Sequence, residues 1–126
     1  MEFNFTNNCP IYIQLADQIV AGILAGEYKP GDKLPSVREF AVIASVNPNT
    51  AQRALAELEA AGLIDTMRNT GKFVTGEESA IEMARQERGL VLAERFIKGM
   101  AALGYSEEQT MEIIQKFCKM EEETHE

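Results

Sequence analysis

Apolar residues recur every three or four positions in the stretch that follows Pro10. They form one stripe of Ile11, Leu15, Ile19 and Ile23. A repeat near 3.6 residues is typical of an amphipathic helix. We expect this helix to end near Gly26, and the Pro30–Gly31 pair beyond it is typical of the centre of a type II turn. Residues 1–8 are polar and are expected to be loosely held.

Two helix starts lie close together in the next stretch. Ser36 and Glu39 have the spacing of a capping box, in which each side chain bonds the backbone N–H of the other residue. Asn47–Pro48 is a second start, because asparagine is a good N-cap and proline loses nothing at the first helical position. We predict helices over about 36–44 and 48–61, which is the pattern of a helix-turn-helix. In that motif the second helix enters the major groove of DNA.

The period changes after Gly62. Residues 63–67 and 72–75 favour β-structure, and residues 68–71 supply turn residues between them. Three helices followed by a β-hairpin predict a winged helix-turn-helix domain over residues 1–76, mainly α with one small hairpin. The hairpin, or wing, commonly lies against the DNA backbone or the minor groove, where Arg68 and Lys72 are placed to serve.

Helical periodicity returns in the second predicted domain, residues 77–126. We expect one helix over about 79–103 and a last helix that begins at a capping box over 106–109, with a frayed tail at 121–126. These helices have a broad apolar side that they cannot bury alone. We therefore predict a dimerisation segment, which would place two recognition helices about one DNA turn apart on a palindromic operator. In the alternative, the helices fold back over the winged domain of a monomer.

A small-molecule effector between the C-terminal helices is compatible with the sequence but is not implied by it. The residues that would line its site are Met83, Met100, Met111 and Met120. Methionine at helical spacing belongs more often to a core. Core positions are also expected for the aromatic residues Tyr12, Phe40, Phe73 and Phe96.

The formal net charge of −8 at first argues against a nucleic-acid partner. Residues 1–76 hold six basic and eight acidic residues, whereas residues 77–126 hold six basic and twelve acidic residues. Most of the acidity therefore belongs to the C-terminal segment. Four of the six basic residues of the first domain fall between Arg38 and Lys72, which permits a modest basic face there.

Several other classes of protein lack support in the sequence. There is no apolar run long enough to span a membrane and no secretory signal pattern at the N-terminus. Cys9 and Cys118 lie near opposite ends, so we expect neither a metal site nor a disulfide, and a reduced cytoplasm is the natural setting. No nucleophile–base pair, metal-ligand spacing or glycine-rich phosphate loop is present, so we expect no enzyme activity and no cofactor.

The chain resembles the GntR family of bacterial transcriptional regulators over residues 10–75. The similarity is carried by Pro10–Leu15 (PIYIQL), Gly26–Glu39 (GEYKPGDKLPSVRE), Val46–Ala54 (VNPNTAQRA) and Leu58–Ile64 (LEAAGLI). The PIYIQL start, the VNPNT helix entry and the short C-terminal part resemble the YtrA-type subfamily. Longer members carry an effector-binding or pyridoxal-phosphate domain after the wing, for which about 50 residues are too few. The resemblance implies a homodimer that represses its own operon, often beside genes for ATP-driven transporters.

The resemblance also implies which residues contact DNA. Arg38 would contact a phosphate or a guanine, and Gly71 at the wing tip would approach the minor groove. The wing departs from the family pattern, since Asn69–Thr70 stand where a glycine beside a basic residue is usual. The other positions that the resemblance implies are Asn47, Asn49, Thr50, Gln52 and Arg53. Ser36 at the helix start and Arg68 and Lys72 in the wing complete the predicted DNA-binding set.

Several of these residues also have a purely structural interpretation. Ser36 and Asn47 are needed as caps, Arg53 has Glu57 at i,i+4 as an ion-pair partner, and Lys72 is compatible with a solvated strand position. We predict a sequence-specific DNA-binding transcriptional regulator, a repressor that acts as a homodimer on a palindromic operator. The alternative is a winged-helix protein-interaction module whose acidic surface meets another protein and which binds no DNA.

Overall fold

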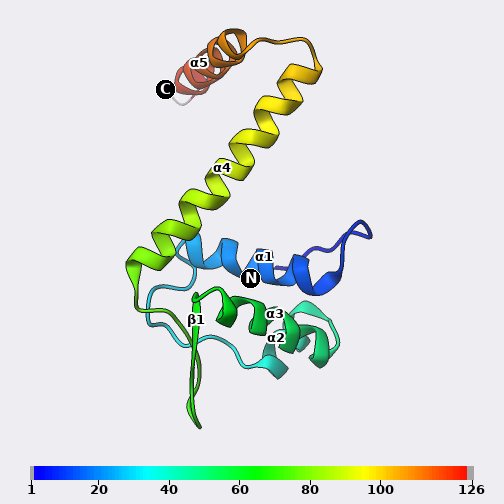
Figure 1. The fold of residues 1–126 in the computed structure, drawn as a ribbon, viewed down its shortest axis with the longest axis vertical. Helices are drawn as coiled ribbons and strands as arrows, with labels where there is room; N and C mark the ends of the chain where they lie inside the picture. The colour runs from blue at the N-terminus through cyan, green and yellow to red at the C-terminus, as the bar shows by residue number, and fades with distance from the viewer. Residues whose placement is uncertain (1, 125–126) are drawn as a thin grey trace. The chain divides into compact units, whose positions relative to one another are not determined.

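The computed structural model describes residues 2–124, in which five α-helices and one β-hairpin are formed (Figure 1). The elements, in order, are α1 (Ile11–Leu24), α2 (Val37–Ala44), α3 (Pro48–Ala60), β1 (Ile64–Met67), β2 (Gly71–Val74), α4 (Glu78–Ala102) and α5 (Glu107–Thr124). The predicted class, mainly α with one small hairpin, is confirmed. The chain forms two compact units, unit 1 (Met1–Arg85) and unit 2 (Gln86–Glu126), which divide inside α4.

The predicted helix starts of the helix-turn-helix are confirmed. The Ser36 hydroxyl accepts a hydrogen bond from the Glu39 N–H at 3.1 Å, and the Ser36 N–H donates to the Glu39 carboxylate at 3.0 Å. The Asn47 side chain accepts from the Asn49 N–H at 2.8 Å, with Pro48 as the first helical residue. These bonds satisfy backbone donors that the helix itself leaves unpaired. The start of each helix is therefore encoded locally.

The end of α1 and the turn after it also follow the sequence pattern. Gly26 has a φ of 87°, in the left-handed region that lets a chain leave a helix. The Asp32 N–H donates to the Lys29 carbonyl at 2.9 Å across Pro30–Gly31, and Gly31 has a φ of 84°. A positive φ at the third residue is the mark of a type II turn, so the predicted turn is confirmed.

The core of unit 1 lies where α3 packs against both α1 and α2 (Figure 1). Its most deeply buried side chains come from these helices and from β2: Leu15, Ile19, Val20, Phe40, Leu55 and Val74. The core position expected for Phe40 is confirmed. Ile81, in the first turns of α4, is also buried in this core. Unit 1 therefore continues past Gly76, where the sequence placed the end of the winged domain.

The N-terminal segment is held more firmly than its polar composition suggested. Phe3 and Phe5 pack on the core, and the Phe3 ring meets Phe40 edge-to-face with centroids 6.4 Å apart. The Gln18 side chain bonds both the N–H and the carbonyl of residue 4, and Gln14 does the same for residue 6, at 2.7 to 3.0 Å. Two glutamines one helical turn apart thus tie the segment down, and the prediction of a loose segment was wrong for residues 2–8.

The hairpin has an additional backbone partner that the sequence pattern does not indicate. β1 and β2 pair antiparallel, from Ile64 opposite Val74 to Met67 opposite Gly71. On the other edge of β2, the Leu34 N–H donates to the Lys72 carbonyl and the Val74 N–H to the Asp32 carbonyl, both at 2.9 Å. The segment that leads into α2 therefore lies along the wing and fixes the wing relative to the helix-turn-helix.

Unit 2 leaves most of its apolar side chains exposed. Phe96 is 45% exposed, so its predicted core position is not found in the single chain. The other large exposed apolar residues of this unit are Leu90, Val91, Leu92, Ile97, Leu103, Tyr105, Met111, Ile114, Phe117 and Met120. A two-helix unit has too little surface to bury both of its own apolar stripes. This is the pattern expected of a surface that another set of helices covers.

The end of α5 is more ordered than predicted. The predicted capping box is present, since Ser106 and Gln109 exchange hydrogen bonds at 2.9 and 3.1 Å. The helix continues to Thr124, whose hydroxyl donates to the carbonyls of residues 120 and 121. Fraying was therefore wrongly predicted for 121–124, and residues 125–126 lie outside the described part. None of the described helices combines the length and apolarity needed to cross a bilayer.

Candidate nucleic-acid interface

The turn between α2 and α3 presents the first turn of α3 to solvent. Ser45 ends α2 with a φ of 55°, and the Val46 N–H donates back to the Ala41 carbonyl at 2.9 Å. This left-handed residue reverses the chain so that α3 begins three residues later, at Pro48. Asn49 is exposed and Thr50 is half-buried on that first turn. Their polar side chains are thus carried on a helix whose start is fixed.

Arg38 lies exposed in the first turn of α2. The carboxylate next to it, Glu39, is occupied by the capping box. Hydrogen bonds from the backbone and hydroxyl of Ser36 lower the pKa of Glu39, and the nearby charge of Lys33 lowers this pKa further. The Glu39 carboxylate therefore stabilises the start of α2, and the Arg38 guanidinium remains available to an external partner.

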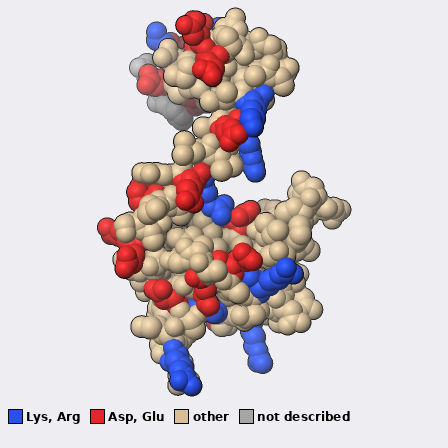
Figure 2. Space-filling view, in the orientation of Figure 1, with Lys and Arg blue, Asp and Glu red and all other residues tan. Residues whose placement is uncertain are grey.

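The tip of the wing is a tight turn that carries Arg68. The Thr70 N–H donates to the Met67 carbonyl at 3.0 Å, and Asn69 has a φ of 67°, a conformation that asparagine tolerates. Arg68 is exposed. Figure 2 shows basic side chains at the end of the hairpin and beside α2 on unit 1. These basic side chains stand apart from one another, and acidic side chains lie on the same unit in this view.

Lys72 is placed differently from either of its predicted roles. Its ammonium pairs with Glu59 of α3 and donates to the Thr66 hydroxyl at 3.0 Å, and its side chain is only 14% exposed. The sequence of the wing alone could not predict this partner, because Glu59 lies on α3, 13 positions before Lys72. Lys72 therefore braces the wing against α3 and is neither a solvated strand residue nor a free wing cation.

This ion pair makes stability depend on pH in a defined direction. Hydrogen bonds from Lys72 and Thr66 lower the pKa of Glu59 below its ordinary 4.5. The stabilisation is therefore present above pH 4.5 and is lost as the pH falls through the lowered pKa. We expect Glu59→Gln to be less stable than wild type by about 0.5–1 kcal/mol at pH 7. In thermal unfolding between pH 3 and 7, this difference should narrow below pH 4.5; a constant difference would contradict the role of the charge.

Gly71 is also placed differently from the prediction. It is the first residue of β2, half-buried, with a φ of 127°. A Cβ at this position would lie 3.1 Å from Cε of Lys33, so the Lys33 side chain occupies the space that the glycine leaves. The tip itself belongs to residues 68–70. The positive φ and the close approach of Lys33 are thus a structural reason for a glycine at this position, and its contact with DNA stays a prediction.

Lys33 is a candidate residue that the sequence analysis missed. It forms a β-bridge to Phe73, its side chain lies against Gly71, and its charge acts on Glu39 of α2. It is exposed and, within residues 2–124, has no ion-pair partner. Lys33 therefore stands between the wing and the start of α2. Lys33 lies within the GDKLPSVRE stretch that carries the family resemblance, and this position could have identified it as a candidate from the sequence.

Arg53 has a partner that the sequence analysis did not consider. Its guanidinium carbon lies 3.9 Å from the centroid of the Tyr12 ring on α1, while the described residues include no Arg53–Glu57 ion pair. The predicted core position of Tyr12 is borne out in part, because the half-buried ring packs on the core and also carries Arg53. Gln52 is exposed beside Arg53 on α3.

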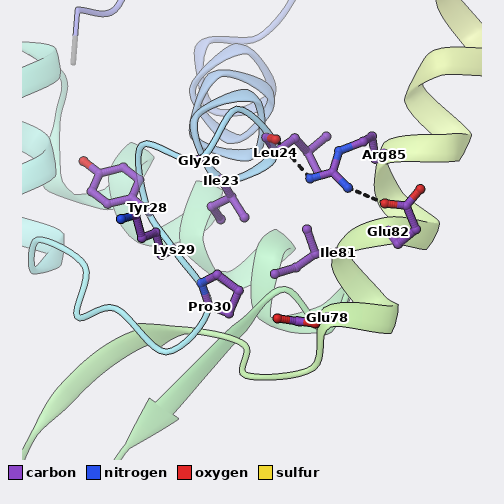
Figure 3. Close-up of a pocket in the computed structure, with 10 residues that line it drawn as sticks. All are labelled: Ile23, Leu24, Gly26, Tyr28, Lys29, Pro30, Glu78, Ile81, Glu82 and Arg85. Atoms are coloured by element: carbon purple, nitrogen blue, oxygen red, sulfur yellow. Dashed lines mark hydrogen bonds and ion pairs between the residues drawn. The ribbon is translucent and has the colours of Figure 1, made fainter.

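A cavity of about 360 Å³ lies within unit 1 at the C-terminal end of α1. Figure 3 shows Arg85 of α4 reaching across it, where the guanidinium donates to the Leu24 carbonyl at 3.1 Å and pairs with Glu82. Ile23, Pro30 and Ile81 supply apolar walls. Arg85 thus ties the first turns of α4 to the end of α1.

One of the four methionines lines a cavity of unit 2. In unit 2, a cavity of about 370 Å³ between α4 and α5 is lined by one of them, Met111. Met83 lies on the part of α4 that belongs to unit 1 and is 64% exposed, and Met120 is also exposed. Helical spacing brings residues to one face only over short stretches of one helix. The lining of an effector site by all four methionines therefore stays a prediction.

Taken together, the exposed first turns of α2 and α3 and the tip of the wing form one candidate interface on unit 1. It offers two guanidiniums, an ammonium and amide and hydroxyl groups, all suited to phosphates and base edges. In residues 2–124, no cluster of three or more His, Cys, Asp or Glu residues is arranged to hold a metal. The exposed groups of this interface are therefore suited to binding an external partner.

Comparison with known proteins identifies relatives that span nearly the whole chain. Residues 11–74 match the family described as "Bacterial regulatory proteins, gntR family". The HTH-type transcriptional regulator YhcF of Bacillus subtilis (strain 168) is 39% identical over 94% of this chain and 98% of its own length. The HTH-type transcriptional repressor YtrA of the same strain is 48% identical, over 55% of this chain and 53% of its own length.

Solved structures agree with this assignment. A GntR family transcriptional regulator from Listeria monocytogenes has a TM-score of 0.84 and 42% identity, covering 89% of this chain and 98% of that chain. AraR(DBD) in complex with operator ORX1 has a TM-score of 0.55 and 26% identity, covering 60% of this chain and 96% of that chain. The winged-helix fold and the resemblance to YtrA-type regulators predicted from the sequence are confirmed.

Proposed function

Because the chain belongs to the gntR family of bacterial regulatory proteins, we propose that this transcriptional regulator is a repressor that binds a palindromic operator as a homodimer. The observation that carries the proposal is the first turn of α3. This turn begins at the Asn47 cap and exposes Asn49 to solvent, and Arg38 is exposed in the first turn of the preceding helix, α2. Repression is supported by the name of the relative YtrA, a transcriptional repressor.

In this proposal, side chains of α3 recognise the base sequence of the operator. Asn49 and Gln52 have the bidentate amide that pairs with adenine, and the Thr50 methyl suits the thymine methyl. Arg38 contacts a guanine or a phosphate, and Arg53 and Arg68 contact the DNA backbone. The operator complex of AraR(DBD) shows that a similar fold engages DNA. Ser36 and Asn47 act mainly as caps, and we withdraw Lys72 from the contact set for the reason given above.

The homodimer is supported by unit 2. Its large exposed apolar residues lie on both helices and on the turn between them, and each keeps between 37% and 74% of its surface exposed in the single chain. Apolar surface of this extent on a small protein marks an interaction site. A second copy presents the same surface, so a two-fold axis through unit 2 buries both at once.

Salt dependence separates this function from the alternative of a protein-interaction module that binds no DNA. We expect the wild-type protein to bind its own upstream region, with log Kd rising linearly with log salt by about 0.9 for each phosphate neutralised. Fluorescence anisotropy with a labelled duplex measures this, and a scrambled duplex is the control. The absence of binding at low salt would overturn the proposal.

The two lysines near the wing provide a matched pair of variants. We expect Lys33→Ala to reduce the salt slope by about one unit per half-site, since it removes a phosphate contact. Lys72→Ala should leave the slope nearly unchanged and should lower stability by about 1 kcal/mol, because it leaves Glu59 unpaired. Salt titrations and thermal unfolding of both variants check this. If Lys72→Ala reduced the salt slope and Lys33→Ala did not, the assignment of Lys33 as a phosphate contact would be contradicted.

A further inference from the structure

The contact between Tyr12 and Arg53 joins two elements that the helix-turn-helix motif itself does not link. Arg53 lies on α3, one turn beyond the residues at the helix entry, whereas Tyr12 lies on the first turn of α1. The guanidinium carbon is 3.9 Å from the ring centroid. This distance is well within the range of a cation–π interaction.

The Tyr12 ring is held in place from two sides. It is half-buried and packs on the core of unit 1. The first turn of α1 is fixed by Gln14, whose side-chain amide donates to the carbonyls of Thr6 and Cys9 at 2.9 and 2.7 Å and whose side-chain oxygen accepts from the Thr6 N–H at 2.8 Å. The ring is therefore a rigid surface against which a flexible side chain can be ordered.

Arg53 is exposed, and its long side chain loses rotamer freedom when it binds a partner. Stacking against an aromatic face uses the flat side of the guanidinium and leaves its N–H donors, which lie in the plane, free for a phosphate. No carboxylate among residues 2–124 pairs with Arg53. The side chain is therefore ordered by an aromatic ring and keeps its charge available.

We propose that Tyr12 is a positioning residue that orders Arg53 for contact with an operator phosphate beside α3. This inference rests on the proposed function, because it assumes that Arg53 contacts DNA. Tyr12 acts through Arg53, so its replacement should weaken operator binding only while the arginine is present.

A double-mutant cycle on the full chain tests this role. Operator affinity and its salt slope are measured by anisotropy for wild type, Tyr12→Leu, Tyr12→Phe, Arg53→Ala and the double variant Tyr12→Leu/Arg53→Ala. We expect Tyr12→Leu to weaken binding about two- to fivefold for each half-site, the range of one exposed cation–π contact. Tyr12→Phe keeps the ring and should stay within about twofold of wild type. In the Arg53→Ala background, Tyr12→Leu should have no further effect.

The outcomes are distinguishable. Equal weakening by Tyr12→Leu in both backgrounds, or no weakening in either, overturns the positioning role while leaving the proposed function intact. A wild type that binds no operator overturns the proposed function and this role with it. Thermal unfolding of each variant identifies a general loss of folding, which would weaken binding equally in the presence and in the absence of Arg53.

Discussion

Replacement of Phe117 by aspartate is expected to convert a dimer into a monomer of 14.0 kDa and to abolish tight operator binding. Phe117 lies on α5 and is 59% exposed in the single chain. The substitution should therefore change the stability of one chain by only about 0.5 kcal/mol. At a dimer interface, however, it buries an unpaired charge, which costs several kcal/mol, about 3–5.

The loss of the dimer should weaken binding to a palindromic operator by at least about 100-fold, because each winged domain would then bind its half-site independently. Light scattering coupled to size exclusion measures the mass, and anisotropy measures the affinity. Gln115→Asp is the matched control, since it adds the same charge at an exposed polar position of α5. A Phe117→Asp protein that remains dimeric would place the interface elsewhere.

Arg38→Ala is expected to produce the largest loss of affinity among the DNA-contact variants. A bidentate contact to guanine is worth about 1–3 kcal/mol. A dimer contains the contact twice, so the loss is about 2–6 kcal/mol, which is at least about 30-fold in affinity. Since Arg38 is exposed and lies outside the core, the fold should remain intact.

Two further variants define what Arg38 contacts. Lys116→Ala removes one positive charge from α5, outside the proposed interface, and should change operator affinity by less than about twofold. Arg38→Lys keeps the charge without the guanidinium fork, so most affinity should remain if the contact is to phosphate and little if it is to guanine. Equal affinities of Arg38→Ala and wild type would remove Arg38 from the interface.

The features that the sequence predicted correctly are those determined by neighbouring residues. The capping box of Ser36 and Glu39 and the Asn47–Pro48 start involve residues at most three positions apart. The type II turn at Pro30–Gly31 is equally local. In each case the two bonded groups lie in one short stretch, so the pattern alone was sufficient.

The features that the sequence missed depend on contacts between distant segments. Lys72 was predicted as a wing cation, but its ammonium pairs with Glu59 of α3, 13 positions away, and the side chain of Lys33, from the segment before α2, lies against Gly71 of the wing. Arg53 was compared with Glu57 on its own helix, whereas its partner, Tyr12, lies on α1. Amphipathic patterns show which side of an element is apolar, but they do not show which other element lies next to it.

Footprinting of the wild-type protein on its own upstream DNA tests the central claim most directly. We predict two protected half-sites, related by a palindrome and centred about one helical turn or a multiple of it apart, because a two-fold dimer presents two α3 helices. Arg38→Ala at the same concentration should leave both half-sites unprotected. Protection of a single unpaired site, or none at low salt, would contradict a dimeric winged-helix repressor.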